Sequence, residues 1–293
     1  MPSASQPAIR TGFIGLGNIG KPMARRLVDA GLETTVFDVA AEPVAELEAA
    51  GARAAGSARE LAGHCDVIGL CVRNDDDVRA VVCGDDGLLA GAAAGTVIAI
   101  HSTVLPGTAV EVGERARANG VGVVDACITG GQDGAEQGTL VYMVGGAAED
   151  IERCRPAFET SAKKIVVTGE LGSGAGTKLC NNLMTYLGFL ATFEASMLAR
   201  GAGLSFEALT EVAQSNGNMG EQQVRFSSLH QLPAEVRADP GFQDHLRSFM
   251  TLAEKDLAVT LAYAREHGVT LPGTGLCAQL MARVYGVDDD GRR

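Results

Sequence analysis

The chain has 293 residues, 46% of them hydrophobic, and this size and composition predict two globular domains with substantial cores. A net charge of -12 argues against nucleic acid or an anionic membrane as a partner, because both need a basic surface. Seven scattered cysteines show neither Cys-x-x-Cys nor zinc-like spacing with histidine, so we expect reduced thiols in a cytoplasmic protein and no metal site. Residues 1–6 are too short and polar for a signal peptide, and no apolar run approaches the ~20 residues of a membrane span.

The first predicted element is a short buried strand at residues 11–14, which runs into a glycine-rich loop and then into a helix that stops at Gly31. A strand, G-x-G-x-x-G and a helix in this order is the context of a dinucleotide-binding loop. The glycines allow a tight turn, a close approach of the backbone to a pyrophosphate, and close packing of helix on strand, while the helix N-terminus is positively polarised. The predicted cofactor-binding residues of the loop are Gly15, Leu16, Gly17, Asn18, Ile19 and Gly20.

The second predicted strand, residues 33–38, ends in a carboxylate 18 residues after Gly20. An acid about 20 residues beyond the glycine loop is typical of the group that binds the adenosine ribose. Asp38 can accept hydrogen bonds from both ribose hydroxyls and would repel the 2′-phosphate of NADP, and neither Val39 nor Ala40 supplies an arginine for that phosphate. We therefore predict NAD in preference to NADP; the alternative is that Asp38 is a plain turn residue.

Helices and strands then alternate with short loops, which predicts an α/β doubly wound parallel sheet. The expected helices are residues 42–50, 58–63, 77–83 and 108–119, and the expected strands are residues 52–55, 66–72, 96–100 and 122–125. In such sheets ligands bind beyond the carboxyl ends of the strands. Val72, Arg73 and residues 101–103 follow two of these strands, and their position favours contact with the dinucleotide over a plain loop.

A hydroxyl and two small residues, Thr129, Gly130 and Gly131, follow the strand expected at 122–125. Successive N–H groups that turn toward one point are typical of an anion nest suited to a carboxylate, and a simple glycine turn is an equal alternative. A hairpin-like pair of strands, residues 138–146 and 164–168, is expected to complete a dinucleotide-binding domain of residues 1–168.

Gly172, Gly174 and Gly176 are expected to precede a long apolar helix over residues 178–200, because glycine weakens a helix interior. Lys178 and Asn182 share one face of that helix through their i, i+4 spacing. A partly dehydrated lysine there can exchange a proton, although a surface lysine is the commoner case. Further helices are expected at 204–214, 243–268 and 275–285, so residues 169–293 form a predicted all-helical substrate and oligomerisation domain. The long helix is apolar on many sides, which predicts burial against a second subunit.

Four blocks of the sequence, in order and spacing, resemble the β-hydroxyacid dehydrogenases, the group of 3-hydroxyisobutyrate dehydrogenase and tartronate semialdehyde reductase. The blocks are residues 15–24, 125–140, 174–182 and 255–257, and together they span nearly the whole chain. Thr129 stands where the family usually has serine, and Cys127 where it usually has proline. The resemblance implies an N-terminal Rossmann domain followed by an all-α domain, joined by the long helix.

The resemblance also implies an activity: hydride transfer between NAD and a small 3-hydroxy acid such as 3-hydroxyisobutyrate. Lys178 would be the catalytic acid and base, and Asn182 would orient the substrate. The substrate carboxylate would bind at Thr129, Gly130 and Gly131. The cofactor would further contact Val72, Arg73, Thr103 and Lys255. Such enzymes are expected to form a homodimer or homotetramer through the helical domain.

Other functions stay open. A tartronate semialdehyde or glyoxylate-type reductase would use the same residues. Imine reductases share the architecture but usually lack a lysine at the position of Lys178, and 6-phosphogluconate dehydrogenases usually have a longer helical domain. A non-catalytic dinucleotide-binding module is a further alternative, although the presence of both Lys178 and Asn182 argues against it.

Overall fold

The computed structural model describes residues 9–289, so the polar segment 1–6 lies outside it. The described chain divides into two compact units between Lys178 and Leu179. This division falls within the long helix α8 (Ser173–Gly201), whereas the domain boundary expected after residue 168 lies before that helix and stays a prediction.

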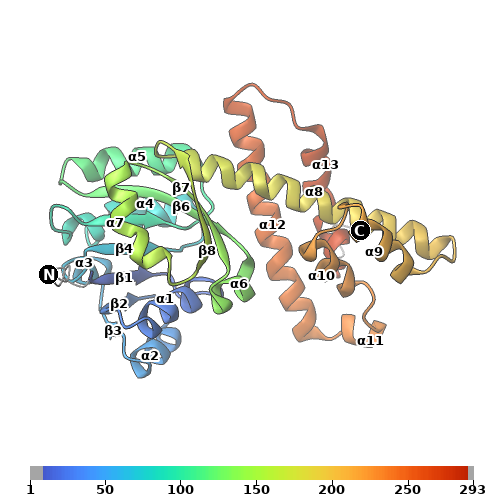
Figure 1. The fold of residues 1–293 in the computed structure, drawn as a ribbon, viewed down its shortest axis with the longest axis horizontal. Coiled ribbons are helices and arrows are strands. Elements are labelled where there is room, and N and C mark those ends of the chain that lie inside the picture. Colours follow the sequence, from blue (N-terminus) through green and yellow to red (C-terminus); the bar gives the residue numbers. More distant parts are fainter. Residues whose placement is uncertain (1–8, 290–293) are drawn as a thin grey trace, which may run out of the picture. The chain divides into compact units, whose positions relative to one another are not determined.

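The first unit is built on an eight-stranded sheet in the order β3-β2-β1-β4-β5-β6-β7-β8 (Figure 1). Neighbouring strands are parallel except β6 and β7, which are antiparallel. The strands are β1 (Thr11–Ile14), β2 (Thr34–Phe37), β3 (Arg53–Ala54), β4 (Val67–Leu70), β5 (Val97–Ile100), β6 (Gly122–Thr129), β7 (Leu140–Gly145) and β8 (Ala162–Gly169). The predicted α/β doubly wound fold is therefore confirmed.

Helices cover both faces of this sheet, and each face has its own core. Successive side chains of a strand point to opposite faces, so Phe13 and Ala99 pack in one core while Ile14 and Ile100 pack in the other. The first core also receives side chains from α1 (Gly20–Asp29), α2 (Ala41–Ala49), α6 (Gly131–Gln137) and α7 (Ala148–Phe158). The second receives them from α3 (Ala58–Ala62), α4 (Asp75–Cys83), α5 (Pro106–Arg117) and the short 3-10 helix η1 (Leu88–Ala90).

The prediction that residues 138–146 and 164–168 form a hairpin-like pair of strands is wrong. β7 and β8 are parallel, and parallel neighbours need a crossover, which α7 provides. Pro156 lies inside the last turn of α7, a position that the sequence alone did not suggest because proline disrupts helix interiors. β6 also runs four residues beyond the expected end at residue 125, since residues 125–129 pair with β7.

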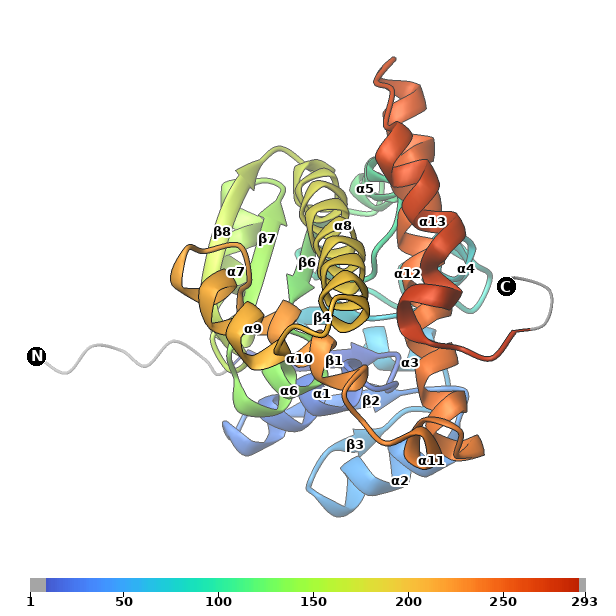
Figure 2. The same ribbon diagram turned by 90° about the vertical axis from the view of Figure 1, so that its right-hand side faces the viewer.

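The second unit is all-helical. Beyond α8, its helices are α9 (Phe206–Ser215), α10 (Glu221–Leu229), α11 (Ala234–Arg237), α12 (Pro240–Glu266) and α13 (Pro272–Tyr285). α12 and α13 lie side by side (Figure 2). The core includes Leu257 and Met281, with the rings of Phe189 and Phe226 stacked at 4.4 Å between centroids. Neither α10 nor α11 was expected from the sequence, because both lie in a polar stretch.

Two absences hold for residues 9–289. No helix there is both long and apolar enough to cross a membrane. Nor do those residues bring together three or more His, Cys, Asp or Glu side chains in a way that could hold a metal ion.

The long helix α8 begins at Ser173. Gly174 and Gly176 therefore lie inside its first turns, whereas the sequence predicted that they would precede the helix. A Cβ at Gly174 would lie 2.5 Å from the carbonyl oxygens of Asp125 and Met143. The helix therefore packs against the backbones of β6 and β7 more closely than any other residue would allow. Close packing thus outweighs the cost of roughly 1 kcal/mol that glycine adds in a helix.

A buried carboxylate holds the start of α8. Asp125 lies in β6 and is fully buried; its Oδ1 accepts a hydrogen bond from the Gly172 N–H at 2.9 Å and its Oδ2 accepts one from the Ala175 N–H at 2.6 Å. The first N–H groups of a helix have no partner within the helix, and Asp125 supplies one. Burial raises the pKa of Asp125 to about 6, and the backbone hydrogen bonds oppose that rise.

Replacing Asp125 by alanine should destabilise the first unit. Asp125→Ala leaves the N–H groups of Gly172 and Ala175 without an acceptor, and orphaned buried donors cost about 1–3 kcal/mol each. We expect the free energy of unfolding, measured by urea titration, to fall by about 2–4 kcal/mol. Asp29→Ala, which removes only an exposed ion pair with Arg25, is the control and should change it by less than about 1 kcal/mol. Equal effects of the two changes would contradict the anchoring role.

Candidate active site

Four strand ends lie level at one edge of the sheet. β2, β1, β4 and β5 are parallel neighbours, and their last residues are in register: Phe37, Ile14, Leu70 and Ile100. Most of the cofactor residues predicted for the first unit follow these strands. The glycine loop, Asp38, Val72, Arg73 and Thr103 are therefore brought to a common edge, where ligands of doubly wound sheets bind.

The glycine loop has the backbone that the motif requires. Gly15 has φ 89°, and a Cβ there would collide with the carbonyl oxygen of Cys71. A Cβ at Gly20, the first residue of α1, would collide with the carbonyl oxygen of Gly15. At Gly17, by contrast, a Cβ would have no described heavy atom within 4 Å apart from its chain neighbours. The loop thus packs tightly at both ends and leaves its middle open for a ligand next to the helix N-terminus.

Asp38 is tied to that loop. Its Oδ2 accepts a hydrogen bond from the Leu16 N–H at 2.6 Å, and its Oδ1 accepts one from the Ala40 N–H at 2.8 Å. Each carboxylate oxygen has a further lone pair with which it can accept from a hydroxyl. Val39, next to it, is 97% exposed. Asp38 therefore fixes the shape of the loop and still presents acceptors at the edge of the sheet.

The ends of β4 and β5 are joined by Ser102, one of the residues 101–103 for which the sequence favoured contact with the dinucleotide. Ser102 Oγ accepts a hydrogen bond from the Val72 N–H at 2.8 Å, and the Ser102 carbonyl accepts one from Cys127 Sγ at 3.4 Å. Arg73 is 87% exposed in its side chain and pairs with Asp77, Nε to Oδ2, at 3.1 Å. Thr103 is half-buried beside Ser102.

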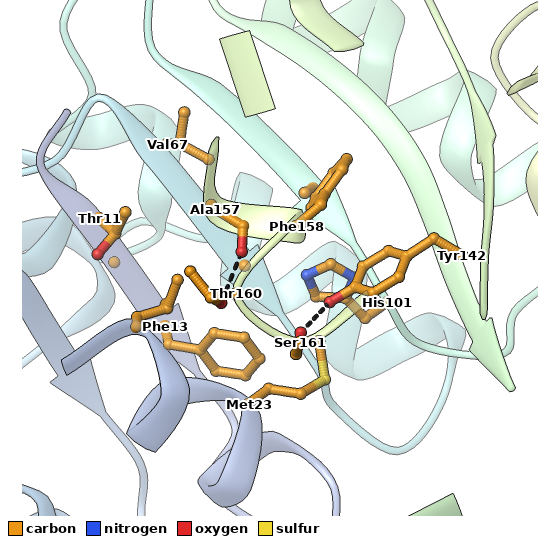
Figure 3. Close-up of a pocket in the computed structure, with 14 residues that line it drawn as sticks. Thr11, Phe13, Met23, Val67, His101, Tyr142, Ala157, Phe158, Thr160 and Ser161 are labelled. Atoms are coloured by element: carbon orange, nitrogen blue, oxygen red, sulfur yellow. Dashed lines mark hydrogen bonds between the residues drawn. The ribbon is translucent and has the colours of Figure 1, made fainter. Parts of the chain in front are cut away.

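His101 follows β5 but lies in the core, not at the ligand edge. Its ring stacks on Phe13 at 5.7 Å between centroids. Its Nδ1 lies 2.8 Å from the Ala126 carbonyl, to which it donates because a carbonyl can only accept. Its ring lines a cavity of about 20 Å³, as do Tyr142 and Ser161, which hydrogen bond to each other at 2.7 Å (Figure 3). Burial lowers the pKa of His101 to about 4.

The predicted carboxylate site lies past the same edge. Asp125 in β6 is level with Ile100 in β5, and Thr129 is four residues further along β6. At about 3.3 Å per residue, Thr129 extends roughly 13 Å beyond that level. Gly130 and Gly131 follow with φ values of 132° and 67°, which only glycine adopts readily, and α6 begins at Gly131.

In the second unit, Asn182 and Lys255 meet at a buried carboxylate. Asn182 Nδ2 donates to Asp256 Oδ2 at 2.7 Å, and the Tyr186 hydroxyl donates to the same oxygen at 3.1 Å. Lys255 Nζ lies 2.9 Å from the other oxygen, Oδ1. Asn182, Tyr186 and Asp256 are all buried, and the Lys255 side chain is partly exposed.

Lys178 is half-buried in α8, four residues before Asn182 and eight before Tyr186. This i, i+4, i+8 spacing places the three side chains on one face of the helix. The helix therefore presents an amine, a carboxamide and a phenol in a row.

Asp256 and Tyr186 are missing from the residues that sequence reasoning selected. Asp256 stands in the block of residues 255–257, Lys-Asp-Leu, and an acid within an otherwise apolar helix face is a signal that it is held by buried partners. Tyr186 repeats the four-residue spacing of Lys178 and Asn182. Both were visible in the sequence as a pattern, but their contact joins residues 70 or more positions apart.

Two family models match the chain. The NAD binding domain of 6-phosphogluconate dehydrogenase matches residues 10–169. The NAD-binding domain of NADP-dependent 3-hydroxyisobutyrate dehydrogenase matches residues 172–292. With the glycine loop at the edge of a doubly wound sheet and an all-helical second unit, these matches define an NAD(P)-dependent dehydrogenase.

Relatives of named activity cover nearly the whole chain. An NAD-dependent L-serine dehydrogenase of Pseudomonas aeruginosa is 36% identical over 92% of this chain and 90% of its own length. A 3-hydroxyisobutyrate dehydrogenase of the same organism is 35% identical over 92% and 90%. The structure of Mycobacterium tuberculosis 3-hydroxyisobutyrate dehydrogenase with L-serine is similar with a TM-score of 0.80, at 31% identity over 95% and 94% of the two chains. The chain belongs to the β-hydroxyacid dehydrogenases, NAD(P)-dependent enzymes that act on 3-hydroxy acids.

The buried His101 predicts a pH dependence of stability. Its pKa is about 4 in the folded chain and 6.5 when exposed, so only the unfolded state takes up a proton between these values. The stability contribution of the neutral ring is present above pH 6.5 and is lost as the pH falls to 4, by up to about 3 kcal/mol. We expect the free energy of unfolding to fall more steeply from pH 6.5 to 4 in the wild type than in His101→Gln, which has no titrating ring. Parallel pH curves for the two proteins would refute the assignment.

Proposed function

We propose that the protein oxidises a small 3-hydroxy acid with NAD, with 3-hydroxyisobutyrate and L-serine as the leading substrates. The observation that carries this proposal is the row on α8: Lys178 one turn before an Asn182 whose carboxamide is held by Asp256. An amine next to a fixed carboxamide suits proton exchange with an alcohol. The named activities of the relatives, an L-serine dehydrogenase and a 3-hydroxyisobutyrate dehydrogenase, support the substrate class.

In the proposed mechanism, neutral Lys178 takes the proton of the substrate hydroxyl as the C–H bond of the same carbon breaks. When bound, NAD accepts the hydride that leaves that carbon. In the reverse direction the Lys178 ammonium returns the proton to the carbonyl oxygen. Asn182 keeps that oxygen in line with the amine. Of these steps, the chain itself contributes positioning and the movement of one proton.

The substrate carboxylate is assigned to Thr129, Gly130 and Gly131. The two glycines have positive φ values, so their N–H groups can adopt directions that other residues cannot reach easily. The Thr129 hydroxyl adds a further donor. Thr129 is bulkier by one methyl group than the serine usual in the family, which favours small acids.

The proposed cofactor is NAD rather than NADP. Asp38 is engaged with two backbone N–H groups and keeps acceptors for the ribose hydroxyls, while a 2′-phosphate would meet its negative charge. The remaining proposed contacts follow the strand ends and one helix of the second unit: the glycine loop from Gly15 to Gly20, Val72, Arg73, Thr103 and Lys255.

We also propose a homodimer or homotetramer formed through the helical unit. Met184 and Leu198 of α8 are 64% and 74% exposed, and such apolar side chains are typical of a surface that a second subunit covers. None of the seven cysteines, all within residues 9–289, forms a disulfide, which accords with the reducing cytoplasm.

A substrate panel tests the proposed activity. We expect purified protein to reduce NAD with at least one of 3-hydroxyisobutyrate, L-serine, D-glycerate and 3-hydroxypropionate, followed as NADH absorbance. The kcat/KM with NAD should exceed that with NADP by about tenfold or more. Tenfold corresponds to about 1.4 kcal/mol of repulsion between the Asp38 carboxylate and the 2′-phosphate. A preference for NADP would contradict the role of Asp38. No turnover of any acid in either direction would favour a dinucleotide-binding module without this activity.

Removing the proposed acid and base should abolish turnover without removing the cofactor. Lys178→Ala should lower kcat by about 10²–10⁴-fold, the range typical of a positioned proton-transfer group. The dissociation constant of NADH, measured by fluorescence titration, should change less than about threefold, since the glycine loop is unaltered. Lys163→Ala on the exposed part of β8 is the matched control and should leave both quantities unchanged. A Lys178→Ala enzyme with wild-type kcat would refute the assignment.

A further inference from the structure

Asp256 collects three polar partners from two helices in the second unit. One of its oxygens accepts from both Asn182 and Tyr186 of α8, and the other lies against the ammonium of Lys255 on its own helix, α12. We propose that Asp256 is a positioning residue for the hydroxyacid dehydrogenase reaction: it fixes the orientation of the Asn182 carboxamide. This inference rests on the proposed function, because it assigns how Asn182 comes to act there.

The orientation follows from the chemistry of the two groups. A carboxylate can only accept hydrogen bonds, whereas a carboxamide has a donor nitrogen and an acceptor oxygen of nearly the same shape. With Nδ2 toward Asp256, the contact is a charge-assisted hydrogen bond of 2.7 Å. A flipped carboxamide would place two acceptor oxygens at that distance and leave a buried donor unsatisfied. Asp256 therefore selects one of the two orientations.

The selected orientation determines what Asn182 offers elsewhere. One N–H of its Nδ2 donates to Asp256, so its second N–H and its Oδ1 can bind other partners. Asn182 is one helical turn from Lys178 and shares its face of α8. A carboxamide free to flip would exchange donor and acceptor on that face, and the oxygen of a bound alcohol would lose its fixed partner.

Tyr186 supports the same carboxylate from the next turn. Burial raises the pKa of Tyr186 well above its ordinary value, and the negative charge of Asp256 adds to that effect, so the phenol stays protonated and donates. Its hydroxyl and the Asn182 carboxamide donate to the same oxygen, Oδ2 of Asp256. Tyr186→Phe is for this reason a matched control: it removes one hydrogen bond from Asp256 and leaves the bond to Asn182.

The decisive experiment is a double-mutant cycle between Asp256 and Asn182, assayed at saturating NAD with the best acid of the substrate panel. Asp256→Ala removes the acceptor, and Asp256→Asn replaces a carboxylate that can only accept by a carboxamide that can also donate toward Asn182. Asn182→Ala and the double variant complete the cycle. Thermal unfolding of each variant shows whether it is folded at the assay temperature, and saturating NAD removes any effect of a displaced Lys255 on cofactor affinity.

If Asp256 acts through Asn182, Asp256→Ala lowers kcat by about 10–100-fold, the loss expected when a positioned group moves. The same change made in Asn182→Ala lowers it by less than about threefold, because there is no carboxamide left to orient. Asp256→Asn also lowers kcat, because a carboxamide at position 256 no longer determines which end of the Asn182 carboxamide faces it. Tyr186→Phe leaves the Asp256 acceptor in place and lowers kcat clearly less than Asp256→Ala does. Independent, multiplying effects of the two alanine changes would overturn the proposal. An Asp256→Asn enzyme with the kcat of the wild type would also overturn it.

A second measurement needs no substrate and separates this inference from the proposed function. The side-chain amide signal of Asn182, assigned by its loss in Asn182→Ala, is followed in ¹⁵N–¹H correlation spectra. In the wild type its protons should exchange slowly with solvent, and in Asp256→Ala they should exchange at least about tenfold faster. Unchanged exchange would refute the contact. Failure of every acid in the panel would refute the proposed substrates and leave this result standing.

Discussion

The fold of this dehydrogenase depends on one contact between a strand and a helix start, the hydrogen bonds from Gly172 and Ala175 to Asp125. An α-helix turns by about 100° per residue, so the residue at which it begins determines which side chains face a given direction. With Asp125 holding the first turn, and Gly174 packed against the backbones of β6 and β7, the start of α8 is fixed both in position and in rotation. Along α8 itself, the four-residue spacing keeps Lys178, Asn182 and Tyr186 on one face.

Buried carboxylates thus act at two points along α8, and each is satisfied differently. The side-chain oxygens of Asp125 accept hydrogen bonds from the backbone N–H groups of Gly172 and Ala175, at the positive end of a helix. Asp256 has Lys255 on one oxygen and two side-chain donors on the other. Burying a charge is costly unless it is paired or hydrogen bonded. Both acids are buried, and each is hydrogen bonded to the groups that it holds in place.

Local patterns predicted much of the fold and of the cofactor site. The apolar strands, the glycine loop between β1 and α1, and Asp38 after β2 follow from short stretches of sequence, and each lies where it was expected. What the sequence did not reveal depends on distant partners. β6 is long because β7 pairs with it, Gly174 is helical because the sheet backbone lies against it, and Asp256 meets Asn182 across 74 positions. The assigned roles of Lys178, Asn182 and the residues 129–131 stay predictions, and so do those of the cofactor-binding residues.

The hydrogen bonds of Asp38 bear on how the cofactor preference of such an enzyme can drift. The side chain proposed to discriminate against a 2′-phosphate also accepts a hydrogen bond from the Leu16 N–H inside the glycine loop. Under that proposal, replacing Asp38 would relax the discrimination and would also remove an acceptor that holds the loop. The Val39 side chain does not hold the glycine loop, because it is almost wholly in solvent. Under the same proposal, a cation introduced at position 39 would add a contact for a 2′-phosphate and leave both hydrogen bonds of Asp38 in place.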